Sequence, residues 1–311
     1  MSVKENILLF LKGMAMGAAD VVPGVSGGTI AFITGIYEKL LDSIKAFDRH
    51  ALQLILKKEW KAFWDKVNGN FLLVLVGGIL VSILTFAKLL GFFLVHYPIQ
   101  LWSFFFGLIV ISSIMVAREV KQWTFAVILS IIAGTLIAYV ITEFTPSQTP
   151  EGLWFIFISG ALAICAMILP GISGSFIMLL LGKYTYIINA LNERNLLVIV
   201  VFALGCISGL LGFSRILSYL LKRFHAIMIA FLAGFMIGSL NKIWPWKETL
   251  ETFTDRHGVI KPLIQRNVWP TEYQRLGHDP QILYALLFGA VGVGIVVLIE
   301  RISQFRKPLG S

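Results

Sequence analysis

Long apolar runs recur through this 311-residue chain and limit its fold more than any other feature. Each run is long enough to cross a bilayer core of about 30 Å as a helix. Charged residues make up only 14% of the chain, whereas soluble domains contain about 25%. The sequence therefore predicts an all-α, multi-pass membrane protein. Six uninterrupted spans are expected, at about 71–95, 99–117, 123–142, 196–221, 226–243 and 281–299.

The charged residues are unevenly distributed, and their positions bear on binding partners. Lys and Arg number 26 against 17 Asp and Glu, which gives a net charge of +9. Most of these charges lie in connectors between apolar spans, as the positive-inside rule predicts, so membrane lipid and not nucleic acid is the expected partner. The two cysteines, Cys165 and Cys206, lie inside apolar segments and are too few for a disulfide framework.

A pattern of Gly, Pro, Ser and Tyr occurs twice in the chain. The stretch from Gly13 matches the stretch from Gly160, and the match resumes with Gly78 on Gly205. The sequence therefore predicts two homologous repeats, residues 1–150 and 151–311. The matched positions are Gly13, Pro23, Gly24, Ser26, Gly27, Gly35 and Tyr37 with Gly160, Pro170, Gly171, Ser173, Gly174, Gly182 and Tyr184, and then Gly78, Lys88, Phe104, Gly107 and Ser112 with Gly205, Arg215, Phe231, Gly234 and Ser239.

Each half begins with an apolar stretch that is interrupted by Pro-Gly, then Val or Ile, then Ser-Gly. Proline lacks an N–H and glycine tolerates unusual dihedral angles, so these motifs should break the helix. We expect two broken, re-entrant hairpins, at about 3–44 and 152–191, each followed by three spans. Each half then crosses the membrane an odd number of times, so the second repeat is inverted. The helix-break residues are Pro23, Gly24, Pro170 and Gly171.

The basic residues favour this inverted topology. With a cytoplasmic amino terminus, the inside segments carry 14 Lys and Arg, whereas the outer segments at 95–98, 143–151 and 183–195 carry two. An outer loop at 241–280 carries six more, and loops of this length follow the rule only weakly. Both chain ends are therefore expected on the cytoplasmic side.

The loop at 45–66 places apolar side chains at helical spacing, with lysines between them. We interpret it as a helix on the cytoplasmic membrane surface near anionic lipids, and the alternative is a solvated connector. The apolar positions are Leu52, Ile55, Leu56, Trp60, Phe63 and Trp64.

The two breaks form the candidate site. Inverted repeats with broken helices are common in secondary transporters, which bind substrate where the repeats meet. The short helix after each break should start near Ser26 or Ser173, and its free N–H groups would bind a phosphate or carboxylate. Gly27, Gly28 and Gly174 would let the anion approach the backbone. The alternative is that the serines only cap helices and the glycines serve close packing.

Two basic residues lie inside predicted spans at matched positions. Lys88 and Arg215 are about two turns from their helix ends, where burying a charge costs roughly 2.5–3.5 kcal/mol. Either side chain could reach the interface by snorkelling. The coincidence of the two positions favours instead a role in neutralising substrate phosphate, each on its own side of the membrane.

Asp20 is the one acidic residue deep in the first broken stretch, and Met167 stands at the matched position. We interpret Asp20 as a carrier of a coupling proton, as a partner of Lys12 or Lys88, or as a local turn-stabilising residue. No cofactor, metal or enzyme activity is expected, because the sequence has no clustered acids, Cys/His ligand spacing or nucleophile motif.

The stretch GMAMGAADVVPGVSGGTIAFITGIYEKL and its second copy ILPGISGSFIMLLLGKY resemble the bacterial polyprenyl-phosphate transporter family. The resemblance covers nearly the whole chain. It implies a translocase, or flippase, that returns undecaprenyl phosphate from the outer to the inner leaflet of the bacterial cytoplasmic membrane. The lipid carrier is then reused for peptidoglycan and other cell-envelope polymers.

The resemblance also implies which residues form the site. The second copy has Ser175 where the first has Gly28, and Phe176 where the first has Thr29. The two ends of the site, one at each copy, therefore need not bind phosphate equally. The residues that it marks are Asp20, Pro23, Gly24, Ser26, Gly27, Gly28 and Thr29 in the first copy, and Pro170, Gly171, Ser173, Gly174 and Ser175 in the second.

Two other functions stay open at this point. A secondary transporter of a small soluble anion would use the same helix termini. A membrane scaffold would instead use the 241–280 loop, with Trp244, Trp246 and Trp269, to recruit a cell-envelope partner.

Overall fold

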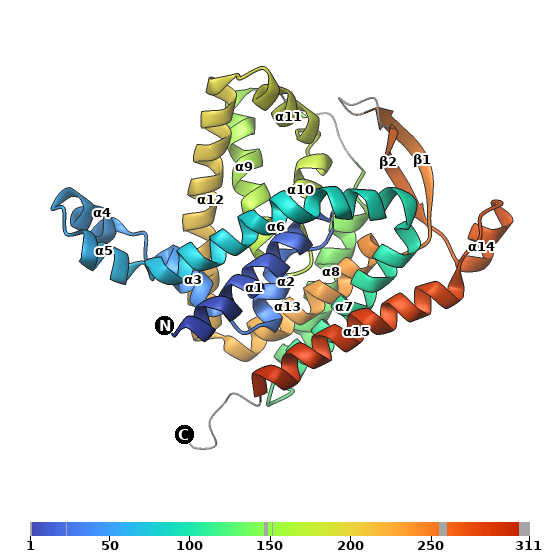
Figure 1. The fold of residues 1–311 in the computed structure, drawn as a ribbon, viewed down its shortest axis with the longest axis horizontal. Coiled ribbons are helices and arrows are strands. Elements are labelled where there is room, and N and C mark those ends of the chain that lie inside the picture. The colour runs from blue at the N-terminus through green and yellow to red at the C-terminus, as the bar shows by residue number, and fades with distance from the viewer. Residues whose placement is uncertain (1, 23, 146–148, 151, 255–259, 305–311) are drawn as a thin grey trace.

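The chain is mostly helical, with one small β-hairpin at the edge of a helical bundle (Figure 1). The computed structural model describes residues 2–22, 24–145, 149–150, 152–254 and 260–304. Its elements are α1 (Val3–Val21), α2 (Gly27–Ile33), α3 (Tyr37–Lys45), α4 (Arg49–Leu56), α5 (Trp60–Lys66), α6 (Gly69–His96), α7 (Pro98–Arg118), α8 (Phe125–Glu143), α9 (Leu153–Ile168), α10 (Gly174–Leu180), α11 (Tyr184–Asn192), α12 (Leu196–Arg223), α13 (His225–Ser239), the 3₁₀ helix η1 (Leu240–Ile243), β1 (Lys247–Thr254), β2 (Ile260–Asn267), α14 (Pro270–Arg275) and α15 (Ile282–Gln304).

Six helices are long and apolar enough to cross a membrane, and they confirm the six predicted spans. These helices are α6, α7, α8, α12, α13 and α15, and the apolar segment of α13 continues through η1. Several of their large apolar side chains are at least three-quarters exposed, among them Leu84, Phe125 and Leu283. Such side chains are suited to contact with lipid, because a soluble protein seldom exposes large apolar patches.

Two hairpins of three shorter helices, α1–α3 and α9–α11, contain the predicted interruptions. We call residues 22–26 the first break and residues 169–173 the second break. The backbone at Gly24 and Gly171 has φ of +87° and +104°, a left-handed region that favours glycine. In the second hairpin, α10 and α11 are bent by 105° relative to each other.

Of the two predicted helix-break prolines, Pro170 lies within the described residues. Pro170 is buried directly before Gly171 and follows the end of α9 by two residues. Pro23 lies outside the described residues. The extended backbone at Val22 (φ −90°, ψ 118°) nevertheless marks where α1 ends.

The bounds of the helices repeat along the chain as the sequence motifs do. α10 and α11 begin and end 147 residues after α2 and α3, and α12 begins and ends 127 residues after α6. α13 likewise begins 127 residues after α7. The repeated sequence pattern therefore coincides with a repeated pattern of helices and breaks.

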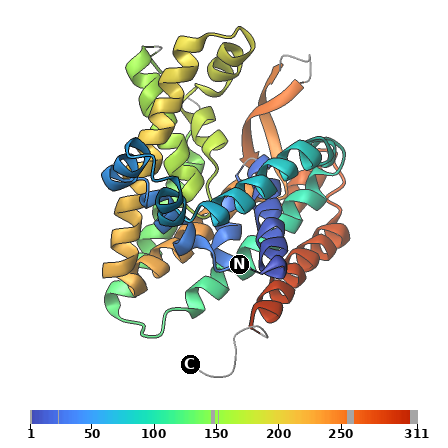
Figure 2. The same ribbon diagram turned by 60° about the vertical axis from the view of Figure 1, so that its left-hand side comes forward.

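The last span of each half packs against the second span of the other half. Within each half the hairpin packs against the first long span, α1 on α6 and α9 on α12. By contrast, α8 packs on α13 and α15 packs on α7, as Figures 1 and 2 show for α15. Glycines permit these contacts, because a side chain at Gly134 would collide with the Phe231 backbone and one at Gly107 with the Gly289 backbone.

The 45–66 loop contains two helices where we predict one. The backbone at Lys58 has φ of +59°, which ends α4 and turns the chain before α5. Leu52, Leu56 and Trp60 are all more than half exposed. An exposed apolar face beside lysines fits contact with a membrane surface.

The 241–280 loop is also structured, and it adds an antiparallel hairpin to the predicted all-α fold. Strands β1 and β2 pair from Lys247 with Asn267 onward. Trp244 and Trp246 anchor this segment, since their Nε1 atoms donate to the carbonyl oxygens of Val268 and Pro280, both at 2.8 Å. Such tertiary contacts support a two-stranded hairpin that would be only marginally stable alone.

Candidate functional site

The two breaks contact each other directly, as the sequence predicts. Ser26 Oγ lies 3.1 and 3.0 Å from the carbonyl oxygens of Met167 and Leu169. In the other direction, the Gly24 amide donates to Ser173 Oγ at 3.1 Å. Each motif serine therefore binds the backbone at the opposite break, and residues 141 to 149 apart in sequence form one polar cluster.

At the first break, the protein's own side chains satisfy the start of α2. Ser26 Oγ accepts from the Gly28 amide at 3.0 Å, and Asp20 Oδ1 accepts from the Gly27 amide at 2.7 Å. A Cβ at Gly27 would lie 2.5 Å from Asp20 Oδ2, so only glycine allows this approach. Asp20 thus makes the turn-stabilising contact considered above, and its carboxylate lies where an anion would bind the helix start.

At the second break, no carboxylate takes the place of Asp20. Met167 is at the matched position, with its Cβ 3.6 Å from where a Gly174 Cβ would lie. Ser173 Oγ accepts from the Phe176 amide at 3.2 Å and lies 3.2 Å from Ser175 Oγ. Among the described residues, the Gly174 amide meets no side-chain acceptor.

The two breaks also differ in burial. Ser26 and Thr29 are fully buried, and the hydroxyl of Thr29 has no hydrogen-bond partner in the described part of the chain. Ser173 is 2% exposed, but Gly174 and Ser175 beside it are only partly buried. The first break is therefore closed in this conformation, while the second keeps some access.

The structure does not bring the matched cations to the breaks. Lys88 and Arg215 are both exposed on their long helices, whereas the breaks are buried. The Arg215 guanidinium donates to the Phe47 carbonyl oxygen at 3.1 Å, beyond the end of α3. Lys12, considered as a partner of Asp20, donates to the Thr34 carbonyl oxygen at 2.6 Å.

A different lysine, Lys242 of η1, does reach the breaks, and sequence reasoning missed it. A Cβ at Gly24 would lie 2.9 Å from Lys242 Cγ, so the side chain runs across the first break. Its Nζ atom lies 4.3 Å from the ring centre of Phe176, next to the second break. The available signal was that Lys242 sits in the last turn of a predicted span, where an ionisable group is costly.

A second lysine, Lys247 on β1, accompanies Lys242. Its Nζ atom donates to the Lys242 carbonyl oxygen at 2.7 Å and lies 3.9 Å from the ring centre of Trp102. Burial, together with the nearby charge of Lys242, holds the pKa of Lys247 well below its usual range. Two cations thus lie close together on one side of the breaks.

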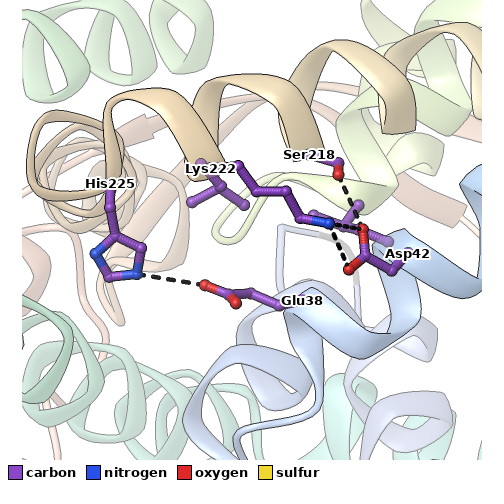
Figure 3. Close-up of a pocket in the computed structure, with 7 residues that line it drawn as sticks. Glu38, Asp42, Ser218, Lys222 and His225 are labelled. Atoms are coloured by element: carbon purple, nitrogen blue, oxygen red, sulfur yellow. Dashed lines mark hydrogen bonds and ion pairs between the residues drawn. The ribbon is translucent and has the colours of Figure 1, made fainter.

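A separate polar cluster joins α3 to the corner between α12 and α13 (Figure 3). Lys222 Nζ lies 2.8 Å from Asp42 Oδ2, and Ser218 Oγ donates to Asp42 Oδ1 at 2.9 Å. His225 Nε2 lies 3.3 Å from Glu38 Oε1. These five side chains line a cavity of about 130 Å³.

The matched positions of the second hairpin cannot form such a cluster. Asn189 on α11 corresponds to Asp42, and Val95 on α6 corresponds to Lys222. In the described structure α3 packs against α12, but α11 makes no comparable packing with α6. Among the described residues, the polar link between hairpin and long span is therefore present only at the end that contains α3.

The fold and the site together define the class of protein. In the described part of the chain, six apolar spans pack with two broken hairpins whose breaks meet, which is a multi-pass membrane protein with paired interrupted helices. In the described residues, no group of three or more His, Cys, Asp or Glu side chains is placed to hold a metal ion. A family model described as undecaprenyl phosphate translocase-like matches residues 16–261, so the chain belongs to this family.

Two curated relatives agree with the family model. A polyprenyl-phosphate transporter from Vibrio cholerae serotype O1 is 47% identical over 296 residues, which cover 95% of this chain and 96% of the relative. A polyprenyl-phosphate transporter from Staphylococcus aureus is 31% identical over 258 residues, which cover 76% and 85%. No solved structure matches the chain.

Proposed function

We propose that this protein is a translocase for polyprenyl phosphate, and specifically for undecaprenyl phosphate. It returns the lipid from the outer to the inner leaflet of the bacterial cytoplasmic membrane, where the carrier is reused in cell-envelope synthesis, including that of peptidoglycan. Family membership supports the substrate class. The observation that carries the proposal is the direct contact between the two breaks, through Ser26 and Ser173, inside a bundle of apolar spans.

The two halves act as inverted repeats in this proposal. The repeated helix bounds support the duplication, and the exchange of α8 and α15 supports a pairing of the halves about a common centre. Both chain ends lie in the cytoplasm, which agrees with the distribution of Lys and Arg. The breaks then lie near the middle of the bilayer, where non-helical backbone must be covered by protein or by water.

The phosphate head group binds at the breaks, and the isoprenoid tail stays in lipid. The residues assigned to the head group are Ser26, Gly27, Gly28, Thr29, Ser173, Gly174 and Ser175. Their hydroxyl and amide hydrogens can replace the water that a phosphate loses in the membrane. Lys88 and Arg215, which are exposed on α6 and α12, attract the lipid phosphate before it enters.

Transport requires the two breaks to separate. In the present conformation the hydrogen bonds of Ser26 and Ser173 to the opposite break occupy the groups that would bind phosphate. A conformation in which the hairpins move apart frees these groups, so the protein alternates between a closed and an opened pair of breaks. The link between Asp42 and Lys222 closes the α3 end while the α11 end lacks such a link.

The test is a transport assay with the purified protein in liposomes. Movement of undecaprenyl phosphate between leaflets is measured for the wild type and for the double variant Ser26→Ala with Ser173→Ala. We expect at least about a tenfold loss of rate, since hydrogen bonds to charged groups contribute roughly 1.5–3 kcal/mol each. Thr85→Ala, which removes an exposed hydroxyl from α6, is the matched control and should leave the rate unchanged.

Two outcomes of this assay would contradict the proposal. One is a wild-type protein that moves a water-soluble anion and leaves undecaprenyl phosphate in place. The other is a double variant that transports the lipid as fast as the wild type, which would mean that the breaks take no part in transport.

A further inference from the structure

The Lys242 side chain has an unusual position for a charged group in this fold. It lies across Gly24 of the first break and ends above Phe176, beside the second break. No ion pair is formed by Lys242 within the described residues. Glu143, whose charge acts on Lys242, accepts a hydrogen bond from the Asn241 side chain at 2.6 Å. A cation held among apolar and aromatic groups without its own carboxylate is suited to an anionic ligand.

The charges at the two breaks are opposite. Asp20 places a carboxylate at the first break, where the Gly27 amide binds it at 2.7 Å. At the second break Met167 leaves this place uncharged, and the ammonium of Lys242 lies over the adjoining Phe176 ring. An ionised Asp20 would repel a phosphate at the first break, whereas Lys242 would attract it at the second.

The hydrogen-bond donors that are accessible follow the same division, because the Thr29 hydroxyl of the first break is fully buried. Ser175 is partly exposed and has a hydroxyl, whereas the matched Gly28 is buried and has none. Lys242 itself has no counterpart, because Met115 is at its matched position on α7. The first repeat therefore has no lysine matched to Lys242, whose ammonium lies beside the Phe176 ring at the second break.

We propose that Lys242, with Ser173 and Ser175, is the main binding site of the phosphate head group, at the second break, and that the residues of the first break bind it only weakly. This inference rests on the proposed function, because it names the place where the lipid phosphate is held. Gly24 serves this site, since any larger residue would push the Lys242 side chain away. The two breaks thus have different tasks, with Asp20 fixing the first as a structural turn.

The test is a binding titration that separates the phosphate from the lipid. The purified protein is titrated with undecaprenyl phosphate and with undecaprenol, the same lipid without a phosphate. We expect Lys242→Met to weaken binding of undecaprenyl phosphate about tenfold or more and to leave undecaprenol binding unchanged. Lys242→Arg should restore most of the affinity. Lys121→Met, which removes an exposed lysine from a connector, is the control and should bind both lipids as the wild type does.

The failure of this inference is distinguishable from that of the proposed function. If the wild type prefers undecaprenyl phosphate and Lys242→Met keeps that preference, the inference is wrong and the function stands. If the wild type binds both lipids equally, the proposed substrate is wrong. Undecaprenol binding reports whether each variant is folded, and Lys242→Gln replaces Lys242→Met if the latter fails this check.

Discussion

The first hairpin, α1–α3, and the second hairpin, α9–α11, can be compared residue by residue. Their second helices have equal lengths, as do their third helices, and the glycines at their breaks share a left-handed backbone. Charge differs at several matched places, including Asp20 against Met167 near the end of the first helix, Asp42 against Asn189 on the third helix and, outside the hairpins, Lys242 against Met115.

This difference separates what shapes the site from what makes it bind. Glycine and serine set the course of the backbone in both breaks, because they permit positive φ and cap the following helix. The preference of phosphate for one break depends on a few side chains that differ between the two repeats. Unequal affinities at the two breaks do not by themselves set the direction of net transport, since they cancel over a complete cycle.

The largest effect is expected from making the second break resemble the first. Met167→Asp places a carboxylate opposite Gly174, where it both accepts from the free amide and repels phosphate. Affinity for undecaprenyl phosphate should fall about 100-fold, in keeping with the loss of one or two charge-assisted contacts. Met167→Asn, which has a similar size and no charge, should lose far less. Equal binding by Met167→Asp and the wild type would refute the assignment of phosphate to the second break.

The next largest effect is expected from Gly24, which has no side chain and so leaves room for Lys242. Gly24→Ala adds both backbone strain at φ +87° and a contact of 2.9 Å with Lys242 Cγ. Gly277→Ala adds nearly the same strain at φ +88°, but with nothing within 4 Å. Unfolding in detergent should show a cost of about 1–2 kcal/mol for Gly277→Ala and about 1–3 kcal/mol more for Gly24→Ala. Only Gly24→Ala should slow lipid transport, and similar behaviour of the two variants would contradict a role for Lys242 packing.

A smaller effect of opposite sign is expected at the first break. Asp20→Asn keeps an oxygen that accepts from the Gly27 amide and removes a negative charge near the head group. Binding of undecaprenyl phosphate should therefore strengthen about threefold, an effect of under 1 kcal/mol. Asp279→Asn is the control, because this exposed carboxylate also accepts from one backbone amide, that of Gln281 at 3.0 Å. Loss of transport by Asp20→Asn with unchanged binding would instead favour proton carriage by Asp20.

Much of the fold could be predicted because apolar length and helix-breaking residues are local properties. The six spans follow from runs of apolar residues, and the breaks follow from Pro-Gly and Ser-Gly. The contact between Ser26 and the second break follows from the repeat, because two interrupted helices in a membrane need cover for their backbone. The hairpin β1–β2 did not follow, since the tertiary contacts of Trp244 and Trp246 hold it in place.

The position of Lys242 could not be predicted for a related reason. Matched spacing indicates that Lys88 and Arg215 have similar surroundings, but it does not indicate which face of the helix they occupy, and both are exposed. Lys242 lies in a segment whose path depends on packing between α13 and the breaks. Its role therefore depends on contacts such as that with Gly24, which no periodicity in the sequence encodes.

The smallest effect concerns the far ends of the hairpins. Burial would raise the pKa of Asp42, but hydrogen bonds from Lys222 and Ser218 and the lysine charges outweigh it, so the pKa is lowered. A lowered pKa in the folded state stabilises the fold above the unfolded value of about 4 and ceases to do so as pH falls through the folded value. Because Asp42 and Lys222 are 43% and 60% exposed, Asp42→Asn should cost under about 1 kcal/mol at pH 7, and this cost should vanish as the pH falls below about 4. Asn189→Asp, at the matched position, should bring no stabilisation at either pH, because Val95 stands where the repeat places Lys222. Thermal unfolding of both variants across this pH range measures the difference, and an equal gain from Asn189→Asp would mean that the two ends are alike after all.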